Sequence, residues 1–345
     1  MKILFLSHHW TTNSHHSRHS GFQRIVAFAA KHHDVTVVTW GLQDQEFGEG
    51  SVRVITVKGP RRDFFFLRRI AISKKGSQIS GQFDAVHALY SDCTFSLAPG
   101  SYTVTFHVLP SVVKYRSIRQ RAFLFLKYLV LQKRALRRAK HIGVVSRNLL
   151  EAIPQKFKSK ASFIPHGVDT EFWDPSLGAA PDSVALKDFV LCVGSHGLDR
   201  DLLTALVHAN PSRQFVFVGL KQRLGEFANT HYLYQLPDAE LRNLYASAIF
   251  MIRPLLFATA NNSILESLSM GKTLLVNRSK GVTDYLGEET CIFMDTLQAG
   301  YSLENLERRL LDPGTLRRHA IDTFGWNKIL DTYIMLYQDK NVQHE

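Results

Sequence analysis

The stretch "RPLLFATANNSILESLSMGKTLLV", residues 253–276, has the pattern of a strand end, a polar loop, a short helix and a second strand. Asn261, Asn262 and Ser263 are candidate N-caps of the helix. Glu266 would fall in its first turn, where a charge at the start of a buried helix needs a reason. Two reasons fit. Ser263 and Glu266 match the S-x-x-E capping box, or the carboxylate serves a ligand beside the free amides of the helix N-terminus.

The same alternation of apolar strands and amphipathic helices runs through both halves of the chain. In the first half we expect strands at 2–7, 34–40, 52–57, 84–90, 102–108 and 141–146, and helices at 22–32 and 118–140. In the second half we expect strands at 189–195, 214–220, 231–236, 249–255, 273–278 and 291–295, and helices at 199–208, 237–247 and 262–270. This pattern predicts an α/β protein with two Rossmann-like, doubly wound parallel sheets, whose strand C-termini face each other across a ligand-binding cleft.

Charge and composition divide the chain near residue 165. Residues 1–165 hold 26 Lys and Arg against 8 Asp and Glu, a balance of +18, whereas residues 166–345 hold 16 against 22, a balance of −6. The change coincides with the Pro- and Gly-rich stretch "IPHGVDTEFWDPSLGAAPDS". We therefore expect a basic N-terminal domain at 1–165 and a second domain at 166–345, and we leave open whether the last helix returns to the first domain.

Neither a membrane span nor a disulfide framework is expected. No apolar run approaches the roughly 20 residues that cross a bilayer, and the apolar run ILFLS after Lys2 is too short for the core of a secretory signal. The three cysteines, Cys93, Cys192 and Cys291, form no C-x-x-C pair. These features favour a cytoplasmic protein that is soluble or peripheral to the inner face of a membrane.

Over nearly its whole length the sequence resembles GT-B fold glycosyltransferases, in particular glycosyltransferase family 4, whose members use nucleotide sugars. The resemblance rests on motifs in the family's order: "DAVHAL", "YTVTFH", "AKHIGVVSRNLLEAI", "FIPHGVDTEFWDP", "VLCVGSHGLDRDLLTAL", "LPDAELRNLYASAIFMIRPL", "NSILESLSMGKTLLV" and "GVTDYLGEE". The resemblance implies an N-terminal acceptor-binding domain and a C-terminal donor-binding domain.

The resemblance also implies roles for individual residues. His107 would face the donor sugar, Arg200 would neutralise the diphosphate, and Glu266 would bind the ribose hydroxyls. The other donor-binding candidates are Gly21, Ser195, His196, Leu236, Asn262, Ser263 and Ile264. Ser195 and His196 stand where the family usually has an arginine. Ala258 occupies the position of the family's first glutamate, so the sugar and the retaining mechanism are left open.

Histidines crowd the segment after the first strand. We expect His15, His16 and His19 to bind the acceptor, and the general base is left open among this group, with His8 and His9 included. The spacing of His15 and His19 could also hold a metal, but no carboxylate accompanies them. We therefore expect no metal and no cofactor, with the nucleoside diphosphate sugar as a co-substrate.

Two segments, 61–75 and 114–140, combine basic and large apolar residues. We expect the middle of the second to pack in the first domain's core and the first to meet an anionic membrane surface. A solvated charged face is the alternative for each. The membrane-facing candidates are Arg61, Arg62, Phe64, Phe65, Phe66, Arg68 and Arg69.

These features together predict a hexosyltransferase that moves a sugar to a lipid-linked or glycolipid acceptor in surface polysaccharide or glycolipid synthesis, with retention favoured weakly. Two alternatives stay open. The basic domain could bind a nucleic-acid acceptor, although no recognisable reading motif supports this. The missing family residues also fit a non-catalytic GT-B partner protein.

Overall fold

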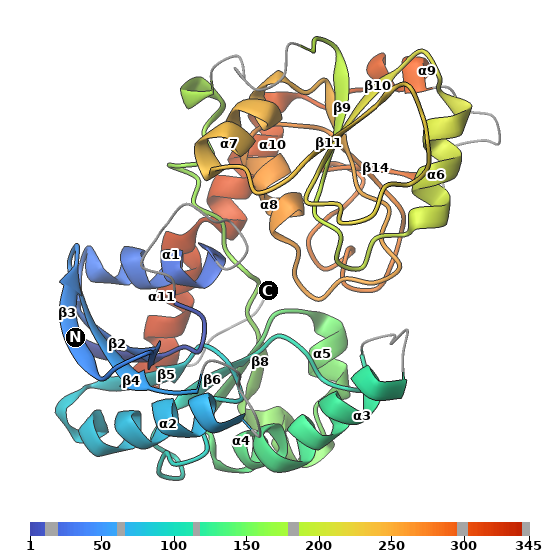
Figure 1. Cartoon of the computed structure of the whole chain (residues 1–345). Coiled ribbons are helices and arrows are strands. Elements are labelled where there is room, and N and C mark those ends of the chain that lie inside the picture. Colours follow the sequence, from blue (N-terminus) through green and yellow to red (C-terminus); the bar gives the residue numbers. More distant parts are fainter. Residues whose placement is uncertain (11–19, 61–65, 113–117, 179–185, 295–302, 340–345) are drawn as a thin grey trace. The chain divides into compact units, whose positions relative to one another are not determined.

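The computed structural model describes residues 1–10, 20–60, 66–112, 118–178, 186–294 and 303–339, which form two compact units (Figure 1). Unit 1 combines the chain up to His166 with the residues from Trp326 onward, and unit 2 comprises Gly167–Gly325. The sequence placed the division one residue earlier and left open whether the last helix returns. In the structure, this helix is part of unit 1.

Unit 1 is built on an eight-stranded sheet with the order β3-β4-β2-β1-β5-β6-β7-β8. Its strands are β1 (Lys2–Leu6), β2 (Asp34–Gly41), β3 (Gln45–Glu49), β4 (Val52–Lys58), β5 (Ala85–Ala88), β6 (Thr103–Phe106), β7 (His141–Val144) and β8 (Ala161–Phe163). All neighbours are parallel except β3 and β4. The central strands are buried on both faces because helices cover both, as their apolar sequences predict.

Helices complete unit 1, with α1 and α11 on one face of the sheet and α2 and α4 on the other (Figure 1). They are α1 (Ser20–Ala30), α2 (Leu67–Ile79), α3 (Ile118–Lys127), α4 (Lys133–Arg138), α5 (Arg147–Ala152) and α11 (Trp326–Tyr337). A π-helical turn, Tyr128–Gln132, joins α3 to α4. Ile25 of α1 and Trp326 and Leu330 of α11 share one core with Ile3 and Val37 of the sheet.

A buried polar network fastens α11 to the sheet. The His87 ring on β5 is fully buried, with Nδ1 2.6 Å from the Tyr337 hydroxyl and Nε2 2.8 Å from Thr105 Oγ1. Thr105 Oγ1 also lies 2.8 Å from the Tyr333 hydroxyl. Both ring nitrogens are thus satisfied without water, as a buried imidazole requires.

Unit 2 is built on a six-stranded sheet with the order β11-β10-β9-β12-β13-β14, in which every pair is parallel. Its strands are β9 (Phe189–Val193), β10 (Gln214–Val218), β11 (Thr230–Leu233), β12 (Phe250–Ile252), β13 (Leu274–Val276) and β14 (Ile292–Phe293). Its helices are α6 (Arg200–Ala209), α7 (Asp238–Ser247), α8 (Asn262–Ser269), α9 (Leu303–Glu307) and α10 (Pro313–His319). Two doubly wound sheets confirm the predicted α/β class.

The sequence analysis missed two strands, β3 and β8, and one of its predictions about packing was wrong. The antiparallel strand β3 was missed because "QEFGE" is polar, and its pairing with β4 depends on a two-residue turn in which Gly50 has a φ of 58°. The centre of the segment 114–140 does not pack in the core. Phe125 and Leu129 are exposed, and the first buried residues in the described part of the segment are Leu131 and Gln132.

The His87 network gives unit 1 a pH-dependent stability. Burial lowers the pKa of His87 to about 3 from its ordinary 6.5. Below about pH 6.5 the unfolded chain therefore takes up a proton on His87 that the folded protein does not. As the pH falls further, His87 should lower the free energy of unfolding by about 1.4 kcal/mol for each pH unit. Denaturant unfolding of the wild type and His87→Gln between about pH 7 and about pH 5 measures the difference in slope. Equal slopes in the two proteins would contradict the assignment.

Candidate functional site

Each sheet has one topological switch point, where the loops that follow two adjacent strands lead to opposite faces. In unit 1 this point lies between β1 and β5, and in unit 2 between β9 and β12. Open parallel sheets bind ligands beyond the carboxyl ends of the strands at such points. We therefore describe the side chains at these two positions, each within its own unit.

In unit 2 the loop after β9 is held by a buried arginine that the sequence analysis did not select. Arg253 follows β12, is 3% exposed, and donates from Nη1 to the Gly194 carbonyl at 2.6 Å and from Nη2 to the His196 carbonyl at 2.9 Å. At Gly197, with a φ of 67°, a Cβ would lie 2.5 Å from the Phe257 carbonyl. The loop thus lies tightly against the segment after β12. An arginine directly after the apolar strand "IFMI" was the signal that could have revealed this contact.

The helix α8 follows the strand β12 in the chain, and Asn261 is its N-cap. Asn261 Oδ1 accepts hydrogen bonds from the Ser263 amide at 3.1 Å and the Ser263 hydroxyl at 2.6 Å. The Ile264 amide donates to the Asn261 carbonyl, and the Ile264 side chain is in the core. Among the described residues, the Asn262 amide has no acceptor within the chain. Among the donor-binding candidates Asn262, Ser263 and Ile264, only Asn262 thus has a backbone amide left for a ligand.

Glu266 lies in the second turn of α8, so the prediction of a first-turn position was wrong. The capping box is excluded because Asn261, and not Ser263, is the N-cap. The Glu266 side chain is buried, and its Oε2 accepts a 2.8 Å hydrogen bond from the Tyr245 hydroxyl. A buried carboxylate in an apolar core is costly unless hydrogen bonds compensate it. Helix-end electrostatics therefore do not explain Glu266, and its role as a ligand for hydroxyl groups stays open.

The other predicted donor residues of unit 2 are Ser195, His196, Leu236 and Arg200. Ser195 and His196 are exposed in the loop after β9, and the His196 ring meets Phe257 edge-on at 5.5 Å. Leu236 is partly buried against the core after β11. Arg200 begins α6, and its Nη2 donates to the carbonyls of Gln222 at 3.1 Å and Arg223 at 2.9 Å. In this structure Arg200 is a contact to the loop after β10.

In unit 1 a buried carboxylate, Asp92, organises the switch point. Its Oδ1 lies 3.3 Å from His8 Nδ1, after β1, and its Oδ2 lies 2.8 Å from both Arg69 Nε of α2 and Lys127 Nζ of α3. Burial alone would raise the pKa of Asp92, but His8, Lys127 and Arg69 outweigh it and hold the pKa well below its usual range. Asp92 is therefore ionised, and it joins three separate elements.

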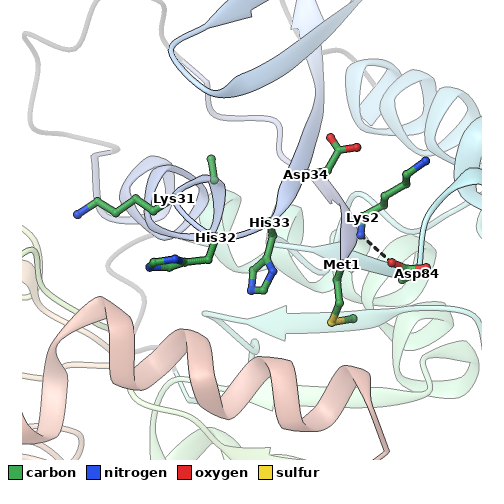
Figure 2. Close-up of a pocket in the computed structure, with 8 residues that line it drawn as sticks. Met1, Lys2, Lys31, His32, His33, Asp34 and Asp84 are labelled. Carbon is green, nitrogen blue, oxygen red and sulfur yellow. Dashed lines mark hydrogen bonds between the residues drawn. The ribbon is translucent and has the colours of Figure 1, made fainter.

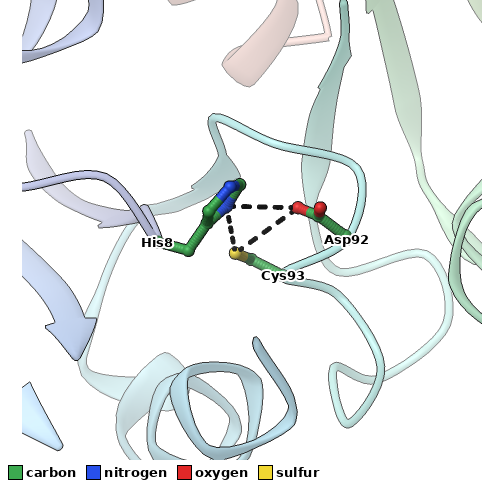
Figure 3. A group of neighbouring side chains, drawn as sticks. All are labelled: His8, Asp92 and Cys93. Atoms are coloured by element: carbon green, nitrogen blue, oxygen red, sulfur yellow. Dashed lines mark hydrogen bonds and ion pairs between the residues drawn. The ribbon is translucent and has the colours of Figure 1, made fainter. Parts of the chain in front are cut away.

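His8, Asp92 and Cys93 also place one metal-binding atom each within 4.8 Å of one another (Figure 3). Burial and the Asp92 charge raise the pKa of the Cys93 thiol well above its usual value, whereas a metal needs the thiolate. Two cations already neutralise Asp92. The geometry suits a hydrogen-bonded cluster at least as well as a metal ligand set, and the prediction of no metal stays a prediction.

Next to this cluster, His107 follows β6. Its Nε2 lies 3.0 Å from the Leu89 carbonyl, so this nitrogen carries the proton. Burial, assisted by His166, lowers the pKa of His107 to about 3. His107 is therefore a neutral hydrogen-bonding group at physiological pH. The Tyr90 ring lies 5.1 Å from it and 4.4 Å from the His8 ring, so the aromatic rings form one continuous group.

Several other predicted residues of unit 1 are placed differently from expectation or lie outside the described part. Gly21 is within the first turn of α1 and not in the loop before it. Phe66, predicted to face a membrane, is buried, with its ring 5.5 Å from that of Phe123. Arg68 lies over the Trp40 ring at 3.4 Å, and Arg69 binds Asp92. His15, His16, His19, Arg61, Arg62, Phe64 and Phe65 lie outside the described residues.

A hollow of about 460 Å³ lies elsewhere on unit 1 (Figure 2). Its lining includes Lys2, Asp34 and Asp84, which begin or precede β1, β2 and β5. The Lys2 amide donates to Asp84 Oδ2 at 2.7 Å. The hollow is therefore at the amino ends of the strands, opposite the edge where such sheets bind ligands.

Two doubly wound sheets, each with polar groups at its switch point, define the GT-B class, and comparisons with known proteins agree. Residues 24–172 match the family model described as Glycosyltransferase Family 4. No curated protein matches the chain in sequence. Among the described residues, no helix combines the length and apolarity that crossing a bilayer requires.

Solved structures share the fold along almost the entire chain. Sucrose-phosphate synthase from Thermosynechococcus elongatus is 16% identical over 98% of both chains, with a TM-score of 0.75. Anabaena HepE, in complex with UDP and glucose, is 15% identical over 98% of this chain and 100% of its own, with a TM-score of 0.69. WaaG, a glycosyltransferase involved in lipopolysaccharide biosynthesis, is 15% identical over 98% of both chains, with a TM-score of 0.63. The predicted GT-B resemblance is confirmed, and these findings support a glycosyltransferase function.

The Asp92 cluster should be essential for the stability of unit 1. Asp92→Asn removes the charge that compensates two largely buried cations, so we expect a loss of about 3 kcal/mol in the free energy of unfolding. Glu46→Gln, which breaks the half-exposed Glu46–Arg53 pair, is the matched control and should show no measurable loss. Chemical denaturation measures both. Equal effects of the two substitutions would show that Asp92 does not organise this edge.

Proposed function

We propose that the protein is a hexosyltransferase that moves a sugar from a nucleoside diphosphate to a lipid-linked or glycolipid acceptor, in surface polysaccharide or glycolipid synthesis at the inner face of a membrane. The GT-B fold and the family match support the transferase class. HepE in complex with UDP and glucose, and a starch synthase domain bound to ADP, support a nucleotide-sugar donor. WaaG and its role in lipopolysaccharide synthesis support a glycolipid-type acceptor.

The observation that carries the proposal is the buried Glu266 on the helix after the switch-point strand of unit 2. A carboxylate oxygen accepts two hydrogen bonds from a vicinal diol, and the Tyr245 hydroxyl fixes its position. The Asn262 amide at the N-terminus of α8 suits a phosphate oxygen. We therefore assign the ribose to Glu266 and the diphosphate to Asn262, Ser195 and His196.

A cation near the departing diphosphate would stabilise its charge in the transition state. Arg200 keeps this proposed role, because its present partners are two carbonyl oxygens reached through Nη2 alone. Exchange of these uncharged carbonyl acceptors for the anionic oxygens of a phosphate is favourable. Arg253 is already bound to two carbonyls and positions the loop that carries Ser195 and His196.

On the acceptor side, we assign the switch point of unit 1, whereas His107 beside it keeps its predicted role toward the donor sugar. His107 in its neutral form can hydrogen-bond to sugar hydroxyls but is a poor proton donor, since burial lowers its pKa to about 3. Retention of anomeric configuration is proposed from the family resemblance alone. The coupling constant of the anomeric proton in the product would decide it.

A test of the donor site uses Glu266→Gln, which keeps the shape of the side chain and removes its charge. We expect the dissociation constant for the preferred nucleotide sugar to rise by about tenfold or more, as expected for hydrogen bonds to a charged group. Glu226→Gln, on an exposed loop of the same unit, is the control. Calorimetry against UDP-, GDP- and ADP-sugars measures binding, and thermal unfolding without ligand checks the fold. Unchanged binding in a folded Glu266→Gln protein would refute the assignment.

Ala258 favours one alternative, a non-catalytic GT-B partner protein. This residue is buried at the position of the family's first glutamate, and a Cβ on the neighbouring Gly281 would overlap the Ala258 carbonyl. A side chain at position 281 therefore cannot supply the missing carboxylate from that side. Donor binding without slow donor hydrolysis or transfer to any acceptor would support this alternative over the enzyme.

A further inference from the structure

The helix α3 and the turn that follows it present large apolar side chains to solvent. The exposed fractions are 87% for Ile118, 53% for Phe123, 55% for Phe125, 47% for Leu126, 45% for Leu129 and 39% for Val130. We call these six residues the apolar face. They lie within 13 consecutive positions, whereas soluble proteins usually scatter exposed apolar residues singly.

The opposite side of the same segment meets the protein with polar side chains as well as with the buried Leu131. Lys127 reaches inward to Asp92, and Gln132 Nε2 donates to the Ser91 hydroxyl at 3.1 Å and the Val108 carbonyl at 2.8 Å. A helix on a soluble domain normally turns its apolar side to the core and its charges to water. In this segment the six residues of the apolar face are turned to water instead, while the ion pair of Lys127 and the hydrogen bonds of Gln132 hold the other side against the protein.

The charge around the apolar face indicates what covers it. Residues 93–150 contain 11 Lys and Arg and no Asp or Glu. Lys133, Arg137 and Lys140, which follow the apolar face in sequence, are exposed. A second copy of the chain that used the same face would bring an equally basic segment to the contact and be repelled. An occupant that is apolar inside and anionic outside fits, and a bilayer with acidic lipids has this chemistry.

We infer that α3 and the Tyr128–Gln132 turn lie in the interface of an anionic lipid bilayer, with the apolar face among the acyl chains and the basic side chains at the headgroups. This deepens the proposed function, because it names the surface that would bring the enzyme to a lipid-linked acceptor. It also replaces Phe66 and Arg69 as membrane contacts, since both are engaged within the fold.

Flotation with vesicles of phosphatidylcholine, with or without phosphatidylglycerol, tests the inference on the full chain without any donor. We expect binding to the anionic vesicles to exceed binding to the neutral ones by about tenfold or more. Phe125→Ser combined with Leu129→Ser should weaken binding to anionic vesicles by a similar factor, about tenfold, because it removes inserted side chains. Lys133→Gln combined with Arg137→Gln should weaken it and reduce its dependence on salt.

Leu256→Ser combined with Leu310→Ser, two exposed residues of unit 2, is the matched control and should bind like the wild type. Phe125 and Leu129 are exposed, and so are the two control residues, so the thermal unfolding of both variants should be unchanged. Equal binding to both vesicle types, no binding, or wild-type binding by the Phe125 and Leu129 variant would overturn the inference. So would a dimer in sedimentation that this variant converts to monomer. Nucleotide-sugar binding by unit 2, measured separately, shows whether the proposed function fails independently.

Discussion

The ionised Asp92 carboxylate is the constraint on which the carboxyl edge of unit 1 depends. It is fully buried, and its partners come from the loop after β1, from α2 and from α3. A charge in this position is tolerated only because cations surround it. The same contacts orient the His8 ring at the switch point and hold Lys127 inward, so that the apolar face of α3 is turned to the outside. The candidate acceptor site and the candidate membrane surface are thus fixed by one side chain.

The two units solve the problem of building a polar site on an apolar sheet in different ways. Unit 1 gathers imidazole and phenol rings, with His107 kept neutral by burial. Unit 2 uses backbone groups: Arg253 draws the loop after β9 against the strand β12, and Asn261 caps α8 while leaving the amide of Asn262 available. Neutral rings suit a sugar, and free amides suit a phosphate.

The sequence predicted the central strands well, because runs such as "KILFL" and "FVLCV" are apolar throughout and only a covered parallel sheet buries both of their faces. It failed where tertiary contacts decide. The "AFLFLK" segment has the composition of a core helix, and only the distant Asp92 shows which side faces the protein. Arg200 was preferred by motif position over Arg253, whose function depends on two carbonyls 57 and 59 positions away in the chain. The N-cap of α8 is Asn261, one of the three candidates that the sequence offered.

The position of α11 has a consequence for how the chain is made. The helix contributes five side chains to one core of unit 1: Trp326, Ile329, Leu330, Tyr333 and Leu336. The hydroxyl groups of Tyr337 and Tyr333 form hydrogen bonds with His87 and Thr105, respectively. As the chain leaves the ribosome, residues 1–166 therefore emerge with a sheet face that α1 covers only in part and with Nδ1 of His87 lacking its partner. In its described residues unit 2 is one stretch of chain and can fold first, whereas unit 1 must wait for the arrival of its last helix, so the order of completion is the reverse of the order of synthesis.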